Sequence, residues 1–199
     1  MRKSGRPKWG SPDNLESLSL EDRERLRDVA LRSIQHGLEE GKAFEPELAA
    51  SGLGLTTPGA TFVTLEIEGN LRGCIGTFEA RHPLIVDVAK NAFAAAFLDH
   101  RFSPITPKEV SRLDLHISLL GPLRPLEARD RQDLLDQLRP GVDGLLLEDL
   151  PHRSTFLPQV WESLQEPADF LEELLRKAGL SRNHWSNTIR FFRYEVEEI

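Results

Sequence analysis

The sequence contains a single cysteine, Cys74, among 199 residues. One cysteine cannot form an internal disulfide, and it excludes a metal site of the CxxC type. Chains without disulfides are typical of reducing compartments. The N-terminal segment also lacks the apolar stretch of about 7–15 residues that marks a secretory signal. The sequence therefore predicts a cytoplasmic protein.

Long apolar runs are missing as well. Apolar residues make up 39% of the chain and charged residues 29%, and no stretch approaches the roughly twenty apolar residues of a membrane-spanning helix. The composition therefore predicts a soluble protein without membrane partners. A length of 199 residues is enough for one compact domain, or one domain in two lobes, with a hydrophobic core.

The sequence also lacks an excess of positive charge. The formal net charge is −7, which opposes long-range attraction to nucleic acid or to an anionic membrane. Nucleic acid is therefore not expected as a partner, although a local basic patch can still exist. Residues 1–14 carry four basic side chains among Gly, Ser and Pro, and we expect a flexible tail there. The alternative is a weak polyanion contact or an address signal. The folded domain is expected over residues 15–199.

Familiar catalytic signatures are also missing. The chain contains no G-x-S-x-G, P-loop or G-x-G-x-x-G pattern. Its histidines show no paired metal-ligand spacing, so no metal site is expected from local motifs. His116 lies on the polar side of a predicted strand and is the best candidate for a general base or ligand. A solvated histidine is the alternative.

Local patterns predict a succession of helices and hairpins. A first helix is expected from a cap at Ser19, with Asp22 in capping-box position, to a C-terminal cap at Gly41. A long loop with room for one helical turn follows, and then a hairpin whose turn lies at residues 68–70. The other expected elements are helices at 84–100, 106–110, 128–139 and 167–180, strands at 113–120, 145–149 and 154–157, and one final strand at 188–199. This order favours an α+β fold with a mostly antiparallel sheet and flanking helices.

The stretch LRGCIG, residues 71–76, surrounds the cysteine with an arginine and two glycines. In an extended strand Arg72, Cys74 and Gly76 would share one face, and Gly73 would lie on the other with Leu71 and Ile75. Residues two apart are separated by about 6.6 Å along a strand. At that separation a guanidinium can favour a thiolate or hold an anion beside it. The glycines are expected to leave room above the strand for a ligand or another backbone.

Plainer interpretations of the same residues stay open. Cys74 can be a small packing residue, with Arg72 reaching sideways to a carboxylate. The G-x-x-G spacing also occurs in the RNA-clamping loop of KH modules, but that loop joins helices and this one lies in a predicted hairpin. Asn91 borders the apolar stripe of its helix and can aim an amide into a cleft, or make a structural hydrogen bond.

Five segments occur in an order that resembles the AMMECR domain family: LRGCIGTFE, AAAFLDHRFSPIT, LRPGVDGLLLED, TFLPQVWESL and LLRKAGL. The similarity covers residues 15–199 and is closest in length to bacterial and archaeal single-domain members, the AmmeMemoRadiSam system protein A type. The resemblance implies an α+β fold in two unequal lobes, with the LRGCIG strand lining a cleft between them. It also implies a pathway shared with a Memo-like protein and a radical SAM enzyme.

The resemblance and the residue chemistry together give a set of candidate site residues. Cys74 and Arg72 are the catalytic candidates, and the binding candidates are Gly73, Gly76, Asn91, Arg101, His116 and Gln159. One function is an enzyme or enzyme subunit that acts on a small anionic molecule, with Cys74 as nucleophile. The other is a non-catalytic module that binds a ligand or partner and uses Cys74 for packing. No cofactor follows from the sequence.

Overall fold

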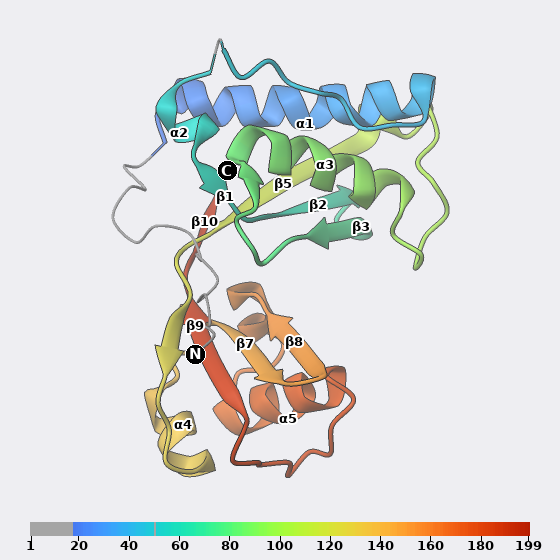
Figure 1. Cartoon of the computed structure of the whole chain (residues 1–199). Helices are drawn as coiled ribbons and strands as arrows, with labels where there is room; N and C mark the ends of the chain where they lie inside the picture. The colour runs from blue at the N-terminus through green and yellow to red at the C-terminus, as the bar shows by residue number, and fades with distance from the viewer. Residues whose placement is uncertain (1–17, 50) are drawn as a thin grey trace. The chain divides into compact units, whose positions relative to one another are not determined.

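The computed structural model describes residues 18–49 and 51–199, and the expected tail at residues 1–14 lies outside them. The described residues divide into two compact units (Figure 1). The first contains the described residues up to Gly121 together with Glu197–Ile199, and the second is Pro122–Val196. Both units combine helices with antiparallel strands, as the α+β prediction requires.

The first unit contains three α-helices and two antiparallel sheets within the described residues. Its main sheet has the strand order β10-β5-β2-β3, and β1 pairs with β4 in a separate ladder. The elements in chain order are α1 (Leu20–Glu40), α2 (Leu53–Thr56), β1 (Pro58–Gly59), β2 (Thr61–Ile67), β3 (Asn70–Gly76), β4 (His82–Pro83), α3 (Leu84–Phe97), the 3-10 helix η1 (Val110–Arg112), β5 (Leu113–Leu120) and β10 (Val196–Glu198).

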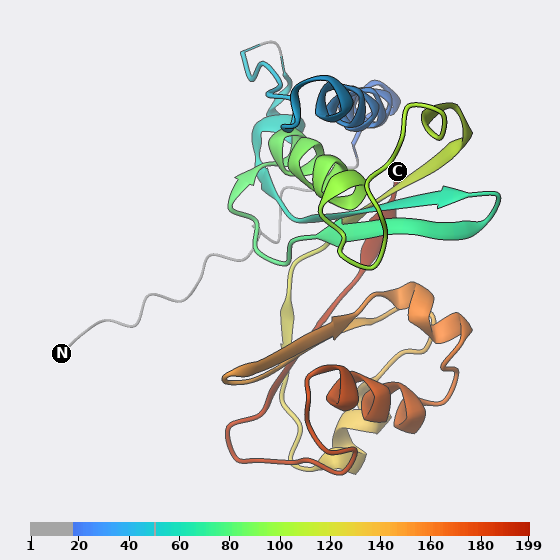
Figure 2. The ribbon, with the colours of Figure 1, turned by 90° about the vertical axis from the view of Figure 1, so that its right-hand side faces the viewer.

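The core of the first unit lies between its helices and its main sheet. Figures 1 and 2 show α3 on one face of β2 and β3, with α1 packed on the outer side of α3. Val63 and Leu65 of β2 and Ile117 of β5 are fully buried against this layer. Alternate residues of these strands face the opposite side, because side chains alternate along a strand.

Local sequence signals set the ends of α1 and the first hairpin as predicted. Ser19 accepts from the backbone N–H of Asp22 in a capping box, and Gly41 ends α1 with φ +67°. Glu68 and Gly69 both have positive φ values, 54° and 74°, between β2 and β3. Two such residues in succession match the two-residue turn that the right-handed twist of a hairpin favours.

The second unit is a four-stranded antiparallel sheet of order β6-β9-β7-β8. Figure 2 shows α5 on one face of this sheet, where Phe170 of α5 stacks on Trp161 with ring centroids 3.8 Å apart. The elements are β6 (Arg124–Leu126), α4 (Arg131–Gln137), β7 (Gly144–Asp149), β8 (His152–Phe156), the 3-10 helix η2 (Pro158–Glu162), α5 (Pro167–Lys177) and β9 (Arg190–Tyr194).

Two expected elements differ in the structure. The predicted final strand is divided in two, because β9 joins the sheet of the second unit and β10 pairs with β5 in the first. The helix predicted at residues 106–110 is reduced to the three-residue η1. The Glu109 carboxylate accepts from the N–H and hydroxyl of Thr106 at 2.8 and 2.7 Å but also binds Arg72, and β5 begins at Leu113.

Candidate functional site

Cys74 lies on β3, the outer strand of the main sheet in the first unit. It pairs with Thr64 of β2, and the Thr64 hydroxyl donates to the sulfur at 3.3 Å. Thr64 alternates with the buried core residues Val63 and Leu65, so the thiol lies on the sheet face opposite α3. The Cys74 side chain is half-buried and the sulfur is a free thiol.

A β-bulge separates Arg72 from the regular ladder of β3. Leu65 pairs with Gly73, but the next residue, Glu66, pairs with Leu71, so Arg72 is an extra residue without a partner on β2. A bulge of this kind interrupts the alternation of side chains. The sequence predicted that Leu71 shares a face with Gly73 and Ile75. That prediction is wrong, because the register places Leu71 opposite Glu66, on the same face as Thr64.

The Arg72 guanidinium reaches sideways to the 98–109 loop, which we define as the residues that connect α3 to η1. It donates to the Glu109 carboxylate at 2.8 Å through Nε and to the carbonyl oxygen of Ser103 at 2.7 Å through Nη1. The hydrogen bond from Arg72, together with those from the hydroxyl and N–H of Thr106, lowers the pKa of Glu109 to about 2. The ion pair therefore persists at neutral pH, and it anchors the loop to β3.

Asp99 and Arg101 occupy the open edge of β3 at Cys74. The Asp99 carboxylate accepts from the Cys74 backbone N–H at 2.9 Å, and Arg101 Nη2 donates to the Cys74 carbonyl oxygen at 3.1 Å. The two side chains thus take the place of a neighbouring strand at this residue. Edge strands that are covered in this way are protected from pairing with other chains.

Asp99 and Arg101 also bind each other. Arg101 donates to Asp99 through Nε at 2.9 Å and through Nη2 at 2.7 Å. This pairing lowers the pKa of Asp99 below its usual range. The pKa of Arg101 is raised, mainly by its hydrogen bond to Asp99, with a smaller electrostatic contribution from Cys74. The cation bound to the Cys74 residue is therefore Arg101, through the Cys74 carbonyl oxygen.

The glycines on either side of Cys74 do not open onto empty space. A Cβ atom on Gly73 would lie 2.1 Å from the carbonyl oxygen of Ala95 in α3, and one on Gly76 would lie 2.3 Å from the Phe62 ring. The room expected above the strand is thus occupied by a helix backbone and an aromatic ring. This is close approach of protein to protein, one of the uses of glycine in strands.

Asn91 belongs to a buried polar cluster between α3, β2 and the end of β3. Its side-chain amide donates to Thr61 and to Asp87. Asp87 also accepts from the Thr61 backbone N–H at 2.9 Å and from the Thr77 hydroxyl at 2.9 Å. Burial raises the pKa of Asp87 although these hydrogen bonds oppose the rise. Two interpretations of Asn91 were given from the sequence: an amide that points into a cleft, or a structural hydrogen bond. The contacts seen here are of the second kind.

His116 of β5 lies in the same cross-strand row as Cys74. Thr64 pairs with Cys74 on one side and with His116 on the other, so all three side chains share the face opposite α3. Two strand spacings separate the Cα atoms of Cys74 and His116 by about 10 Å. Proton transfer between the two side chains would therefore need the Thr64 hydroxyl or a water molecule between them.

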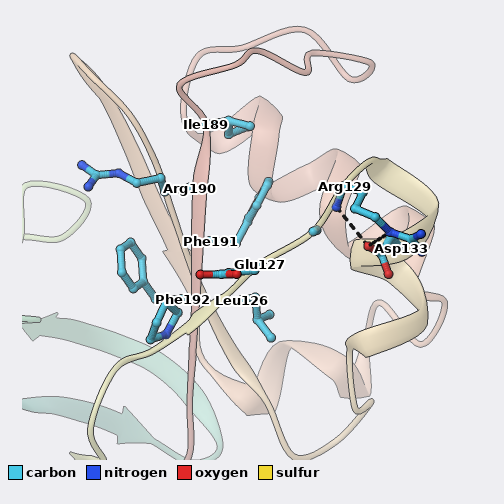
Figure 3. A pocket seen from close by; sticks show the side chains of 10 residues that line it. Leu126, Glu127, Arg129, Asp133, Ile189, Arg190, Phe191 and Phe192 are labelled. Carbon is cyan, nitrogen blue, oxygen red and sulfur yellow. Dashed lines mark hydrogen bonds and ion pairs between the residues drawn. The ribbon is translucent and has the colours of Figure 1, made fainter.

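Gln159 belongs to η2 in the second unit, whereas Cys74 belongs to the first. The second unit has its own open pocket of about 760 Å³ beside β6 and β9. In Figure 3 Ile189, Phe191 and Leu126 form its apolar part, and the bonded pair Arg129 and Asp133 lies at one end. None of the predicted site residues lines this pocket.

Residues 18–49 and 51–199 show no group of three or more His, Cys, Asp or Glu side chains that could hold a metal ion. None of the helices in this described part of the chain has the length and apolar character needed to cross a bilayer.

Sequence reasoning identified Cys74, Arg72 and Arg101 but missed three of the groups that bind them. Asp99 was not singled out, although the pattern D-x-R just after a helix offers an internal ion pair. Thr64 is a partner of Cys74 only through the hairpin register. Glu109 was interpreted as a helix cap, and its bond to Arg72 spans 37 positions of sequence.

Known proteins match this chain over most of its length. The sequence pattern of the AMMECR1 family matches residues 27–199. The chain belongs to the AMMECR1 family. A protein of Methanothermobacter thermautotrophicus is 39% identical over 142 residues, which cover 68% of this chain and 72% of that protein. A protein of Aeropyrum pernix is 34% identical over 195 residues, which cover 94% and 82%.

The AMMECR1 fold also appears in a crystal structure of an uncharacterized protein from Pyrococcus horikoshii. It is 29% identical to this chain with a TM-score of 0.80, and the match covers 87% of this chain and 88% of that one. The names of these three relatives state no activity. The comparisons therefore give the family and the fold, and a function must be argued from the chemistry around Cys74.

Proposed function

We propose that this AMMECR1-family protein is an enzyme, or a subunit of one, that acts on a small anionic molecule through the thiol of Cys74. The observation that carries the proposal is the arrangement at the sulfur. The Thr64 hydroxyl donates to it at 3.3 Å, and the Arg101 guanidinium donates to the carbonyl oxygen of the same residue at 3.1 Å. A hydrogen-bond donor at a partly exposed sulfur and a cation bound to the same residue are features of reactive cysteine sites.

Each side chain has a role in this proposal. The Cys74 sulfur forms a bond to an electrophilic carbon of the substrate while the bond of that carbon to its leaving group, or the π bond of its carbonyl, breaks and its electron pair moves onto the departing group or the carbonyl oxygen. The thiol proton leaves to water or through Thr64 toward His116. Arg101 binds the anionic group of the substrate, because its side chain is 49% exposed while Arg72 is bound to the 98–109 loop through Nε, Nη1 and Nη2. Arg72 therefore supports the site by fixing the loop that carries Asp99 and Arg101.

The proposal includes the setting in which the reaction takes place. Membership in the AMMECR1 family supports a pathway shared with a Memo-like protein and a radical SAM enzyme. A reducing, cytoplasmic location is consistent with the one unpaired cysteine of the chain.

Charge-selective alkylation of Cys74 tests the proposal. The chain has one cysteine, so all thiol labelling reports on this residue. We compare the rate with iodoacetate, which is anionic, to the rate with iodoacetamide, which is neutral. Arg101→Gln is expected to lower the ratio of these rates about three- to tenfold, because a nearby cation attracts the anionic reagent.

The control is Arg32→Gln, which removes an exposed arginine of α1 that also has a carboxylate partner, Asp28, at 3.7 Å. This helix packs on the side of α3 away from the sheet, so the ratio should stay at its wild-type value. An unchanged ratio in Arg101→Gln, with both variants folded, would contradict the role of Arg101 as the cation that recognises an anion.

The second candidate function is a binding module without catalysis, and the filled space at the glycines favours it. The Phe62 ring fills the space above Gly76 on the Cys74 face, and Ala95 fills the space above Gly73 on the face toward α3, so the protein itself occupies the room expected at both glycines. In that case the sulfur packs against its neighbours and the surrounding polar groups hold the sheet edge. Slow labelling by both reagents, without charge preference, is the outcome that this candidate predicts.

A further inference from the structure

We infer that Asp99 is a positioning residue of the proposed Cys74 site, because its carboxylate holds both the Arg101 guanidinium and the Cys74 backbone in place. The inference rests on the proposed function, and it assigns a role to a residue that the sequence did not single out. Asp99 acts through Arg101 and Cys74 and does not itself touch the sulfur in any of its hydrogen bonds.

The location of Asp99 is unfavourable for a carboxylate unless its partners compensate. Its side chain is 2% exposed, and it follows the last residues of α3, where the helix dipole opposes negative charge. Burying a charge without partners is strongly destabilising. A carboxylate at this position therefore requires a specific set of donors, and the structure supplies them.

Every oxygen of the Asp99 carboxylate accepts two hydrogen bonds. Oδ1 accepts from the Arg101 backbone N–H at 3.2 Å and from Arg101 Nε at 2.9 Å. Oδ2 accepts from Arg101 Nη2 at 2.7 Å and from the Cys74 backbone N–H at 2.9 Å. Two parallel bonds between a carboxylate and a guanidinium fix the plane and the direction of the arginine.

Arg101 is held from two further sides. Nη2 donates to the Cys74 carbonyl oxygen at 3.1 Å, and the guanidinium carbon lies 5.5 Å from the centroid of the Phe102 ring. Nε and Nη2 are therefore engaged with the protein, and Nη1 is the nitrogen that can still donate to a ligand. Arg101 can therefore bind an anion through Nη1, and the direction in which its guanidinium points depends on Asp99.

The Arg72–Glu109 pair offers a comparison within the same loop. It also joins β3 to the 98–109 loop through a partly buried ion pair, but its other contacts are with loop carbonyls and not with the Cys74 peptide. Anchoring the loop alone is thus already provided by Arg72. The contribution specific to Asp99 is the link between the cation and the residue that carries the thiol.

A double-mutant cycle on the alkylation ratio tests the inference. The iodoacetate-to-iodoacetamide ratio is measured in the wild type, Arg101→Gln, Asp99→Asn and the double variant. If Asp99 positions Arg101, Arg101→Gln lowers the ratio about three- to tenfold when Asp99 is present but less than about twofold in the Asp99→Asn background. If Arg101→Gln lowers the ratio equally in the wild-type and Asp99→Asn backgrounds, Asp99 does not position Arg101 and the inference is overturned.

The matched control is Glu109→Gln, which removes the carboxylate partner of the other arginine. Arg72 keeps its hydrogen bonds to the carbonyl oxygens of Ser103 and Pro104 in this variant, so the loop stays anchored. The effect of Arg101→Gln should therefore remain at its wild-type size in this background, and a loss there would overturn the specific role of Asp99. If Asp99→Asn does not fold, Asp99→Glu replaces it, and there too the effect of Arg101→Gln must be smaller than in the wild type. An Arg101→Gln variant that leaves the wild-type ratio unchanged contradicts the proposed function itself.

Discussion

Replacing Gly73 by alanine is expected to destabilise the protein by roughly 3 kcal/mol, because the new methyl group has no space. The added Cβ would lie 2.1 Å from the carbonyl oxygen of Ala95 and 3.0 Å from its carbonyl carbon. These atoms belong to the backbone of α3, so they cannot rotate away as a side chain does. Strand and helix would have to separate, and the fully buried residues between them would lose contacts.

Urea unfolding of Gly73→Ala against Gly52→Ala measures this effect. Gly52 is the N-cap of α2 with φ −62°, and a Cβ there would meet its nearest atom, Asp22 Oδ1, at 3.8 Å. The control should therefore lose about 1 kcal/mol or less, the cost of alanine at an N-cap position. Equal unfolding midpoints for the two variants would show that α3 does not approach β3 as closely as the structure has it.

Removing the Asp87 side chain is expected to cost about 3–5 kcal/mol, while Asp87→Asn stays within about 1 kcal/mol of the wild type at neutral pH. Asp87 is 1% exposed and accepts from Thr61, Thr77 and Asn91. Asp87→Ala leaves these buried donors without an acceptor, whereas an amide keeps one acceptor and places its NH2 toward the Thr77 hydroxyl. Denaturant unfolding of both variants measures the difference.

The difference in free energy of unfolding between the wild type and Asp87→Asn should also change with pH. Burial raises the pKa of Asp87 in the folded state above its ordinary value of 3.8, so folding favours the protonated form. The stabilisation from this group is fully present below pH 3.8 and is lost as pH rises through the folded-state pKa. Asp87→Asn should therefore gain stability relative to the wild type over that rise. A difference in free energy of unfolding that does not change with pH would contradict the raised pKa.

Elements with local signals could be predicted from the sequence, and those that depend on distant pairings could not. The capping box at Ser19 and the strand at 113–120 are encoded by neighbouring residues, and both were confirmed. The division of the final strand depends on which sheet each half joins. No pattern within residues 188–199 carries that information, because the choice of sheet is made by pairing with distant residues of β5, β6 and β7.

The same limit applies to the candidate site. The LRGCIG stretch indicated where to look, but a one-residue bulge at Arg72 changed which side chains share a face. The bulge became visible only when β3 was aligned with β2. The arginine that interacts with Cys74 comes from the 98–109 loop, and its carboxylate partner lies two residues away in that loop. Sequence spacing on one strand could not reveal a cation supplied by another segment.

Intact-mass measurement of the folded protein after treatment with iodoacetamide tests the account most directly, because its central claim is that Cys74 is an accessible, reactive thiol. The sulfur lies on the face opposite α3 and accepts from Thr64, while Arg101 binds the carbonyl oxygen of the same residue. We expect one added group per chain in native buffer, at a rate at least equal to that of the same chain unfolded in urea. A folded protein that gains no mass until urea is added would contradict the account.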